Sequence, residues 1–215
     1  RKMKIFGKLM LLVGGSVICL VTALSLAGYF IFTDFGDTAA DKQLHIAAAV
    51  VRGTIAEAVK QHSALSDLIA VDAAFARAVA DKDHQKIRAM ARTLAERDGV
   101  DLVTVCDTET TVLGRGHSDK RGDALGPARA SARIPLREGR RIVGMEPGNV
   151  VRLTLASGTP VVHEGVIVGA VIIGQDLSSG AFTAAMKKTL DVECSVFLGD
   201  TRVATTLSSE GKPLT

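Results

Sequence analysis

The longest apolar stretch of the sequence lies close to its N-terminus. Residues 9–32 form 24 consecutive positions without a charged side chain. A helix needs about 20 apolar residues to cross a hydrocarbon core of about 30 Å, so this pattern predicts a transmembrane helix. Basic residues precede the stretch and acidic residues follow it, which places residues 1–8 in the cytoplasm and the remainder beyond the membrane. The basic residues are Arg1, Lys2, Lys4 and Lys8.

A cleaved signal peptide is the alternative interpretation of this stretch. Ser25 and Ala27 are small residues at a suitable cleavage site. The apolar run continues beyond them to Phe32, which is longer than the apolar core of a usual signal peptide and favours an uncleaved anchor. Under both interpretations the body of the protein is exported.

After the apolar stretch, the spacing of apolar residues becomes that of an amphipathic helix. Leu44, Ala48, Val51 and Ile55 recur at intervals of three and four positions, which places them along one stripe of a helix. The sequence therefore predicts a stalk helix over residues 33–62.

Shorter helices and then strands are expected next. His62, Ser63, Ser66 and Asp67 interrupt the apolar stripe, and from Val100 the apolar residues follow the alternation of strands. The expected helices are 67–80, 84–98 and 128–133, and the expected strands are 100–105, 112–113, 140–145, 150–156, 159–163 and 166–174. Helices followed by a central antiparallel sheet predict the α+β fold class.

The C-terminal part of the sequence predicts a further helix and hairpin. The helix covers residues 179–190, and β-like runs at 194–198 and 202–206 flank Gly199. So short a hairpin cannot bury a core of its own. Residues 181–215 are therefore expected to be the start of a second module that continues beyond this sequence.

Composition excludes several function classes. The formal net charge of +3 arises partly from the N-terminus, and other Lys and Arg residues are interspersed with Asp and Glu, so nucleic-acid binding is not expected. Tryptophan is absent and only 4% of residues are aromatic, which makes an aromatic ligand box improbable. The three cysteines show no CxxC spacing, so neither a disulfide framework nor a zinc ribbon is predicted.

No motif of a known catalytic chemistry occurs in the chain. The sequence lacks the serine-hydrolase, zinc-protease and phosphate-loop motifs, and Gly114 and Gly116 lack the third glycine of a dinucleotide-binding turn. Cys106, Asp107 and His117 are the nearest approach to a metal-ligand set, but an acidic turn explains Asp107 more simply. We expect no enzyme activity, no metal and no cofactor.

Several segments resemble one known family, the two-module Cache domains of bacterial sensors. Residues 103–112 resemble the first Cache hairpin, and Arg115–Asp123 resemble the loop that follows it. Residues 146–148 and 158–169 resemble the closing strands, and residues 191–206 resemble the opening of the second module. The resemblance covers residues 38–215.

This resemblance implies a PAS-like sensor module at residues 63–180, held outside the cytoplasm by a helix in the inner membrane. It also implies the N-terminal region of a methyl-accepting chemotaxis protein, in which a small organic acid, amino acid or amine binds and a conformational signal passes to the membrane. Receptors of this kind pair along the stalk helix, so we expect a homodimer.

Candidate ligand-binding residues come from the expected pocket between the sheet and its loops. Arg115 and His117 are two positions apart, so in extended backbone they point the same way and together suit a carboxylate. Arg133 belongs to a basic run near the expected rim of the pocket, where it is either solvated or attracts an anion. The resemblance implies that Asp176 pairs with a ligand ammonium, and a helix cap is an equally good interpretation of that residue.

Two other functions remain open at the level of sequence. The same module serves histidine kinases and cyclic-dinucleotide enzymes, and only the cytoplasmic part of the protein would separate these from a chemoreceptor. A membrane-anchored structural protein without a small ligand is the third interpretation.

Overall fold

The computed structural model describes the backbone of residues 2–126, 129–148, 151–209 and 212–213, and the side chains of residues 20–29, 41–126, 129–148 and 151–208. The chain divides into two compact units, Arg1–Val51 and Arg52–Thr215.

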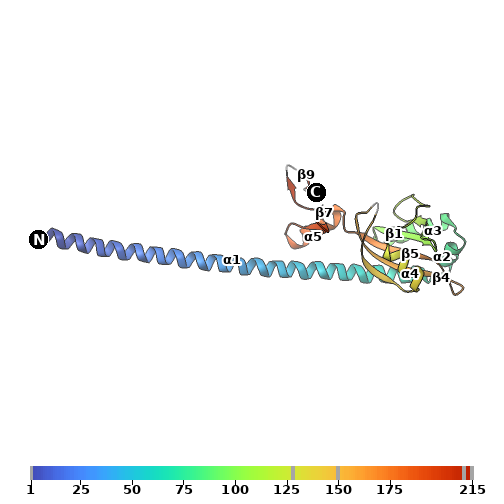
Figure 1. Ribbon diagram of the computed structural model, residues 1–215, viewed down its shortest axis with the longest axis horizontal. Helices are drawn as coiled ribbons and strands as arrows, with labels where there is room; N and C mark the ends of the chain where they lie inside the picture. The colour runs from blue at the N-terminus through green and yellow to red at the C-terminus, as the bar shows by residue number, and fades with distance from the viewer. Residues whose placement is uncertain (1, 127–128, 149–150, 210–211, 214–215) are drawn as a thin grey trace. The chain divides into compact units, whose positions relative to one another are not determined.

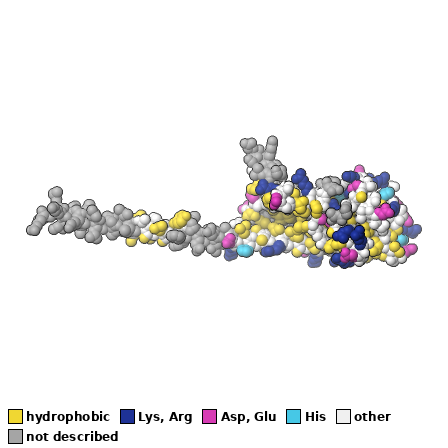
Figure 2. All heavy atoms as spheres, in the orientation of Figure 1, with side chains coloured by type: hydrophobic (Ala, Val, Ile, Leu, Met, Phe, Trp, Pro, Cys, Tyr) yellow, Lys and Arg dark blue, Asp and Glu magenta, His cyan; other side chains and the backbone are white. Residues whose placement is uncertain are grey.

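Helix α1 is continuous over Lys2–Ala70, a length of 69 residues (Figure 1). The predicted membrane segment, residues 9–32, lies outside the residues with described side chains except at 20–29. The large apolar side chains of 20–29 are exposed at the helix surface (Figure 2). Within the part of the chain whose side chains are described, no helical segment is long and apolar enough to cross a membrane.

The predicted break in this helix at residues 62–67 is wrong, because α1 continues to Ala70. His62 and Ser66 are buried in the second unit, with 4% and 0% of their surface exposed. The Ser66 hydroxyl donates a hydrogen bond to the Ser63 carbonyl at 3.0 Å. Packing of these polar residues against the sheet therefore overrides their weak helix propensity.

Two capped helices follow α1. Helix α2 spans Ala73–Ala80, and the carboxylate of Asp72 accepts a hydrogen bond from the Phe75 amide at 2.7 Å at its N-terminus. Helix α3 spans His84–Asp98 and ends at Gly99, whose φ of 63° is the left-handed conformation that suits glycine. The predicted helices at 67–80 and 84–98 are thus confirmed in type, with the start of the first corrected to Ala73.

The central sheet has five antiparallel strands in the order β2-β1-β5-β4-β3. The strands are β1 (Leu102–Asp107), β2 (Val112–Arg115), β3 (Ile142–Pro147), β4 (Leu153–His163) and β5 (Val166–Asp176). Helix α4 (Ala130–Glu138) lies between β2 and β3 in the sequence and packs on β3, β4 and β5. The expected α+β fold with a central antiparallel sheet and a PAS-like arrangement is confirmed.

Strand β4 joins two strands that the sequence predicts separately, at 150–156 and 159–163. Gly158 lies within it, opposite α4. A Cβ atom added to Gly158 would lie 1.8 Å from the Ser131 carbonyl oxygen, so only glycine allows α4 to approach the strand this closely. The turn to β5 is formed by Glu164 and Gly165, both with positive φ, as predicted for this hairpin.

The two faces of the sheet have different covers. One, the helix-covered face, packs against α2, α3 and the end of α1. Its buried side chains are Val103, Val105, Val161, Val171 and Ile173 from the strands, with Phe75, Val79, Ile87 and Leu94 from the helices. The other, the loop-covered face, packs against α4 and the segment that follows β2. Its buried side chains are smaller and include Cys106, Ala156, Ala170, Ile172 and Ala132.

The C-terminal segment contains one helix and short strand pairs. Helix α5 spans Gly180–Leu190, and β6 (Ser195–Leu198) pairs with β7 (Thr201–Thr205). Strands β8 (Ser208–Ser209) and β9 (Lys212–Pro213) form a second small pair. The predicted helix and hairpin in this region are confirmed.

Candidate functional site

A cavity of about 220 Å³, here called the sheet cavity, lies on the loop-covered face. The strands supply its floor with Leu102, Thr104, Thr154, Ile172 and Gly174. Its walls are His117, Ser118, Lys120, Asp123 and other residues of the segment after β2, together with Arg115, Arg129, Pro147, Gly148 and Val151. Charged and hydroxyl groups thus surround a small space beside the core.

Arg115 organises the wall of the sheet cavity. It is the last residue of β2 and only 8% exposed. Its two terminal nitrogens each donate to a different oxygen of the Asp123 carboxylate at 2.8 Å, and one also donates to the Lys120 carbonyl at 2.7 Å. The hydrogen bond and charge of Arg115 lower the pKa of Asp123. This bidentate pair fixes the segment between the two residues.

His117 contributes a neutral imidazole to the same wall. The Val103 amide lies 3.3 Å from its Nδ1 atom, which therefore accepts the hydrogen bond and leaves the ring proton on Nε2. Partial burial and then the positive charge of Arg115 lower the pKa of His117 below 6.5. At neutral pH the residue is accordingly uncharged and offers an N–H donor.

Arg129 adds a second guanidinium on the opposite side of the cavity. It is the N-cap residue of α4, and it pairs with Glu146 of β3 at 2.9 Å. Glu146 is 7% exposed and also accepts hydrogen bonds from the amide and hydroxyl of Ser131. Arg129 is thereby held at the cavity by a carboxylate that is itself fully bonded.

Thr154 places an unsatisfied hydroxyl in the floor of the sheet cavity. The residue is 2% exposed, and its Oγ1 atom has no hydrogen-bond partner among the described residues. A buried polar atom without a partner costs about 1–3 kcal/mol. A ligand in the cavity that hydrogen-bonds to this hydroxyl would remove that cost.

The structure brings two of the four predicted site residues together. Arg115 and His117 both line the sheet cavity. Asp176 lies past it at the end of β5, where its carboxylate accepts hydrogen bonds from the amide and hydroxyl of Ser178 at 2.8 and 2.6 Å. Arg133 is exposed on α4 and is not part of the cavity lining. The binding roles assigned to these four residues stay predictions.

Three residues at the cavity were not among the ligand-binding residues predicted from the sequence. Thr154 is flanked by Leu153 and Leu155, so strand alternation alone would have placed it on the other face of the sheet from two apolar neighbours. Arg129 lies inside the helix predicted at 128–133, whereas the observed helix begins at Ala130 and makes Arg129 its N-cap residue. Asp123 has no local signal, because it lies in an irregular segment and its partner Arg115 is eight positions away at the end of β2.

The near-constellation of Cys106, Asp107 and His117 has a structural explanation. The Asp107 carboxylate accepts hydrogen bonds from the Glu109 and Thr111 amides at 3.0 and 2.9 Å and from the Lys82 ammonium at 2.8 Å. Burial raises the pKa of the Cys106 thiol to about 12. Among the described residues no group of three or more His, Cys, Asp or Glu side chains is placed to hold a metal.

Comparison with family models identifies the chain. Residues 38–215 match the model of the double sensory domain of two-component sensor kinases, dCache_3. The chain belongs to this family. The match covers both the module that contains the sheet cavity and the C-terminal helix and hairpin. No curated protein matches the sequence.

Solved structures share the fold of this dCache_3 chain at low sequence identity. The E. coli DcuS sensor domain is 19% identical with a TM-score of 0.52, covering 65% of this chain and 98% of that domain. The V. cholerae histidine kinase DctB sensor domain is 11% identical with a TM-score of 0.61, covering 78% and 65%. The C. jejuni chemoreceptor Tlp3 ligand-binding domain, in complex with 4-methylisoleucine, is 12% identical with a TM-score of 0.54, covering 77% and 67%. This chain therefore spans about two thirds of the DctB and Tlp3 domains.

Proposed function

We propose that this chain is the ligand-binding sensor of a transmembrane receptor and that the sheet cavity binds a small organic anion. The observation that carries the proposal is the convergence of two guanidiniums, one neutral imidazole and one unpartnered hydroxyl on a single cavity of about 220 Å³. Drug-sized ligands occupy pockets of about 300–1,000 Å³. A volume below that range suits a small metabolite.

The charges of the cavity favour a carboxylate ligand over an amine. Arg115, Arg129 and Lys120 line it, and Asp123 and Glu146 balance the two arginines. The surplus positive charge attracts anions, and a guanidinium binds a carboxylate through charge-assisted hydrogen bonds. Among the ligand classes expected from the sequence, organic acids therefore come first.

Amino acids are the second ligand class, because they also carry a carboxylate. The Tlp3 domain of similar fold was solved with 4-methylisoleucine. In this chain, Asp123 is the carboxylate of the cavity that would meet an ammonium group. Simple amines lack the anionic group that the two arginines require, and we expect them not to bind.

We further propose that the N-terminal helix anchors the sensor in the inner membrane and that the sensor lies on the periplasmic side. The large apolar residues Leu20 and Leu24 are each more than 60% exposed on α1, so the helix presents apolar side chains at its surface. Charged residues on the two sides of the run set the orientation, as in the sequence analysis. The sensor acts by binding rather than catalysis, and pairs as a homodimer along α1.

Two observations bear on the kind of signalling protein to which this sensor belongs. The family is described by its occurrence in two-component sensor kinases, whereas the Tlp3 domain belongs to a chemoreceptor. A chemoreceptor of the methyl-accepting type is our first proposal, and a sensor kinase is the alternative. The sequence of the cytoplasmic portion separates them.

Calorimetric titration of the detergent-solubilised chain tests the ligand proposal. The panel contains mono- and dicarboxylates, neutral amino acids and aliphatic amines. We expect a carboxylate to bind, and Thr154→Val to weaken it about tenfold because the valine keeps the shape and removes the hydrogen bond. Arg129→Gln should abolish detectable binding.

Arg133→Gln is the matched control for this experiment. It removes an arginine from the same helix, one turn beyond Arg129, at an exposed position outside the cavity. Its affinity should lie within twofold of the unsubstituted chain. Binding of amines alone, or equal losses in the control and in Thr154→Val, would refute the proposed site.

A further inference from the structure

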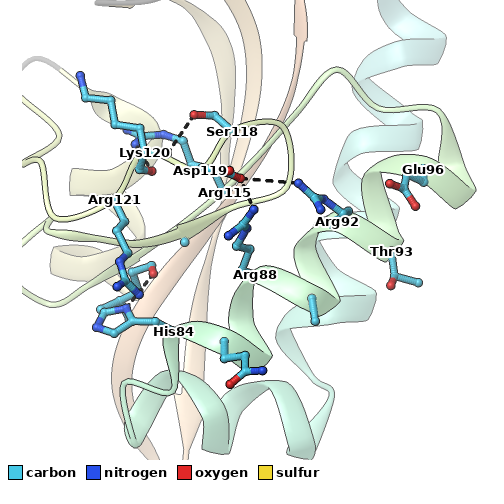
Figure 3. A pocket seen from close by; sticks show the side chains of 14 residues that line it. His84, Arg88, Arg92, Thr93, Glu96, Arg115, Ser118, Asp119, Lys120 and Arg121 are labelled. Atoms are coloured by element: carbon cyan, nitrogen blue, oxygen red, sulfur yellow. Dashed lines mark hydrogen bonds and ion pairs between the residues drawn. The ribbon is translucent and has the colours of Figure 1, made fainter.

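A second, larger cavity lies on the other side of the segment that follows β2. This helix cavity has a volume of about 720 Å³ and is formed between α3 and residues 113–121 (Figure 3). Its charged and titratable lining residues are His84, Arg88, Arg92, Glu96, Asp119, Lys120 and Arg121, with Arg115 behind them. It shares Arg115, Ser118 and Lys120 with the sheet cavity but lies on the α3 side of that segment.

Positive charge dominates this helix cavity. Arg88, Arg92, Lys120 and Arg121 contribute four cations, against the two acidic residues Asp119 and Glu96. Arg88 and Arg92 are four positions apart on α3, so their side chains project from the same face of the helix. Arg115 carries its own carboxylate partner, Asp123, and adds no net charge.

Asp119 shows what this arrangement of arginines can hold. One oxygen of its carboxylate is paired with Arg88, and the same oxygen lies 3.6 Å from Arg92 (Figure 3). Two guanidiniums therefore converge on one anionic oxygen. The Asp119 side chain is 74% exposed, so solvent and solutes have access to the pair.

The backbone around Asp119 is held at both ends of the segment. A Cβ atom added to Gly116 would lie 2.4 Å from the Ala91 carbonyl oxygen, which shows how closely the segment packs on α3 at its start. At the other end, Gly122 has a φ of +79° and its amide donates a hydrogen bond to the Val112 carbonyl at 2.9 Å. The exposed Asp119 side chain can therefore rotate away from the arginines toward solvent while the backbone at Gly116 and Gly122 stays in place.

Arg121 extends the cationic surface of the cavity away from Asp119 (Figure 3). The His84 Nδ1 atom lies 2.8 Å from the Leu113 carbonyl, to which it donates, and this bond fixes the ring at the cavity. Arg121 extends toward His84 (Figure 3). An anion with several oxygens would reach donors on both sides of the cavity, which a single carboxylate cannot do.

We propose that the helix cavity is a binding site for a tetrahedral oxyanion of the phosphate type and that Asp119 is an internal substitute for it. A phosphate offers more oxygens and more charge than a carboxylate, and arginine forks match its geometry. The anion displaces Asp119 from Arg88 and Arg92. The proposal of this anion site does not rest on the function proposed for the sheet cavity, and it is tested separately.

Titration of the full 215-residue chain in detergent with inorganic phosphate, at constant ionic strength, tests the proposal. The decisive variant is Asp119→Ala. If Asp119 competes with the anion, its removal should tighten phosphate binding about tenfold, in line with the loss of one charge-assisted competitor. If Asp119 merely supports the fold, its removal should leave phosphate binding unchanged or weaken it, and that result would overturn the proposal.

The double variant Arg88→Gln/Arg92→Gln supplies the opposite arm, and should weaken phosphate binding at least tenfold even when combined with Asp119→Ala. Arg77→Gln is the matched control, because Arg77 is an exposed helix arginine paired with an aspartate, Asp81, outside the cavity. Its affinity should be unchanged. Equal losses in control and double variant would mean general charge attraction and refute a defined site. Glycerol phosphate as a second titrant separates a free ion from a phosphate monoester.

Discussion

The two faces of the central sheet use the same strands but differ in the size of their side chains. On the helix-covered face, valine and isoleucine alternate into a space that α2, α3 and the end of α1 fill completely. On the loop-covered face, the corresponding positions are mostly smaller. They are Cys106, Ala156, Ala170, Thr104, Thr154 and Gly174, beside the larger Leu102 and Ile172. Small residues leave room, and charged groups from loops surround that room. Side-chain size along a strand therefore separates the face that packs against helices from the face that leaves a cavity.

The largest expected effect breaks the helix-covered face. Phe75 is completely buried there, so Phe75→Ala should lower the free energy of unfolding by about 3–5 kcal/mol through lost burial and a residual cavity. Urea unfolding followed by circular dichroism measures the change. Ligand affinity of the folded fraction should stay within twofold, since the sheet cavity lies on the other face. A loss below about 1 kcal/mol would contradict the assignment of this face as the principal core.

A medium effect is expected at the contact between β4 and α4 on the loop-covered face. Gly158→Ala forces its new Cβ against the Ser131 carbonyl, and backbone must shift to relieve the clash. The expected loss of stability is about 1–3 kcal/mol. The shift also moves the start of α4 and with it Arg129, so carboxylate binding should weaken beyond the loss of stability.

Gly144→Ala is the control for this clash. Gly144 lies in the edge strand β3 and has no atoms within 4 Å of an added Cβ. Its substitution should be neutral or stabilise by about 0.4–1 kcal/mol through the unfolded chain. The free energy of unfolding and the ligand affinity of both variants come from the same unfolding curves and titrations. Equal effects of Gly158→Ala and Gly144→Ala would show that the close approach at Gly158 is not limiting.

The smallest effect concerns pH and compares histidines from the two faces. Burial lowers the pKa of His62 on the helix-covered face, and the opposing charge of Asp101 is too weak to restore it. The unfolded chain thus binds a proton more readily than the folded chain, and stability falls as the pH drops below 6.5. The loss is at most about 1.4 kcal/mol for each pH unit.

Unfolding curves between about pH 8 and pH 5 measure this dependence. His62→Leu should flatten the slope, because leucine fills a similar volume without a titrating group. His117 contributes with the same sign from the loop-covered face, so its own replacement should flatten the remainder. A slope that survives both substitutions would place the titrating groups elsewhere.

The sequence predicted most of the elements because strands and helices have strong local signals. The hairpin at Glu164 and Gly165 and the apolar run of β5 are examples, since turn residues and β-branched residues act over a few positions. The continuation of α1 through His62 and Ser66 could not be predicted, because burial of those residues depends on a sheet whose strands lie far away in sequence. The union of two predicted strands into β4 depends in the same way on α4 packing against Gly158.

The candidate site was predictable only where it follows strand geometry. Arg115 and His117 line one cavity, as the two-residue spacing suggested. Thr154 follows the alternation of β4, whereas Arg129 reaches the cavity through the fold of α4, which no local pattern encodes. Asp176 ends β5 beside Thr154, but its carboxylate is bonded to Ser178 and it does not line the cavity. Its place in a ligand site came from resemblance rather than from spacing.

Arg115, Ser118 and Lys120 line both cavities, so the segment after β2 is a partition wall between two compartments. A shift of this segment toward one cavity changes the volume and the charge of the other cavity. By thermodynamic reciprocity, whatever factor an occupant of the first compartment imposes on binding in the second is returned without change. This one short segment, held at Gly116 and Gly122, is therefore the physical link through which occupancy beside α3 would alter binding at the sheet.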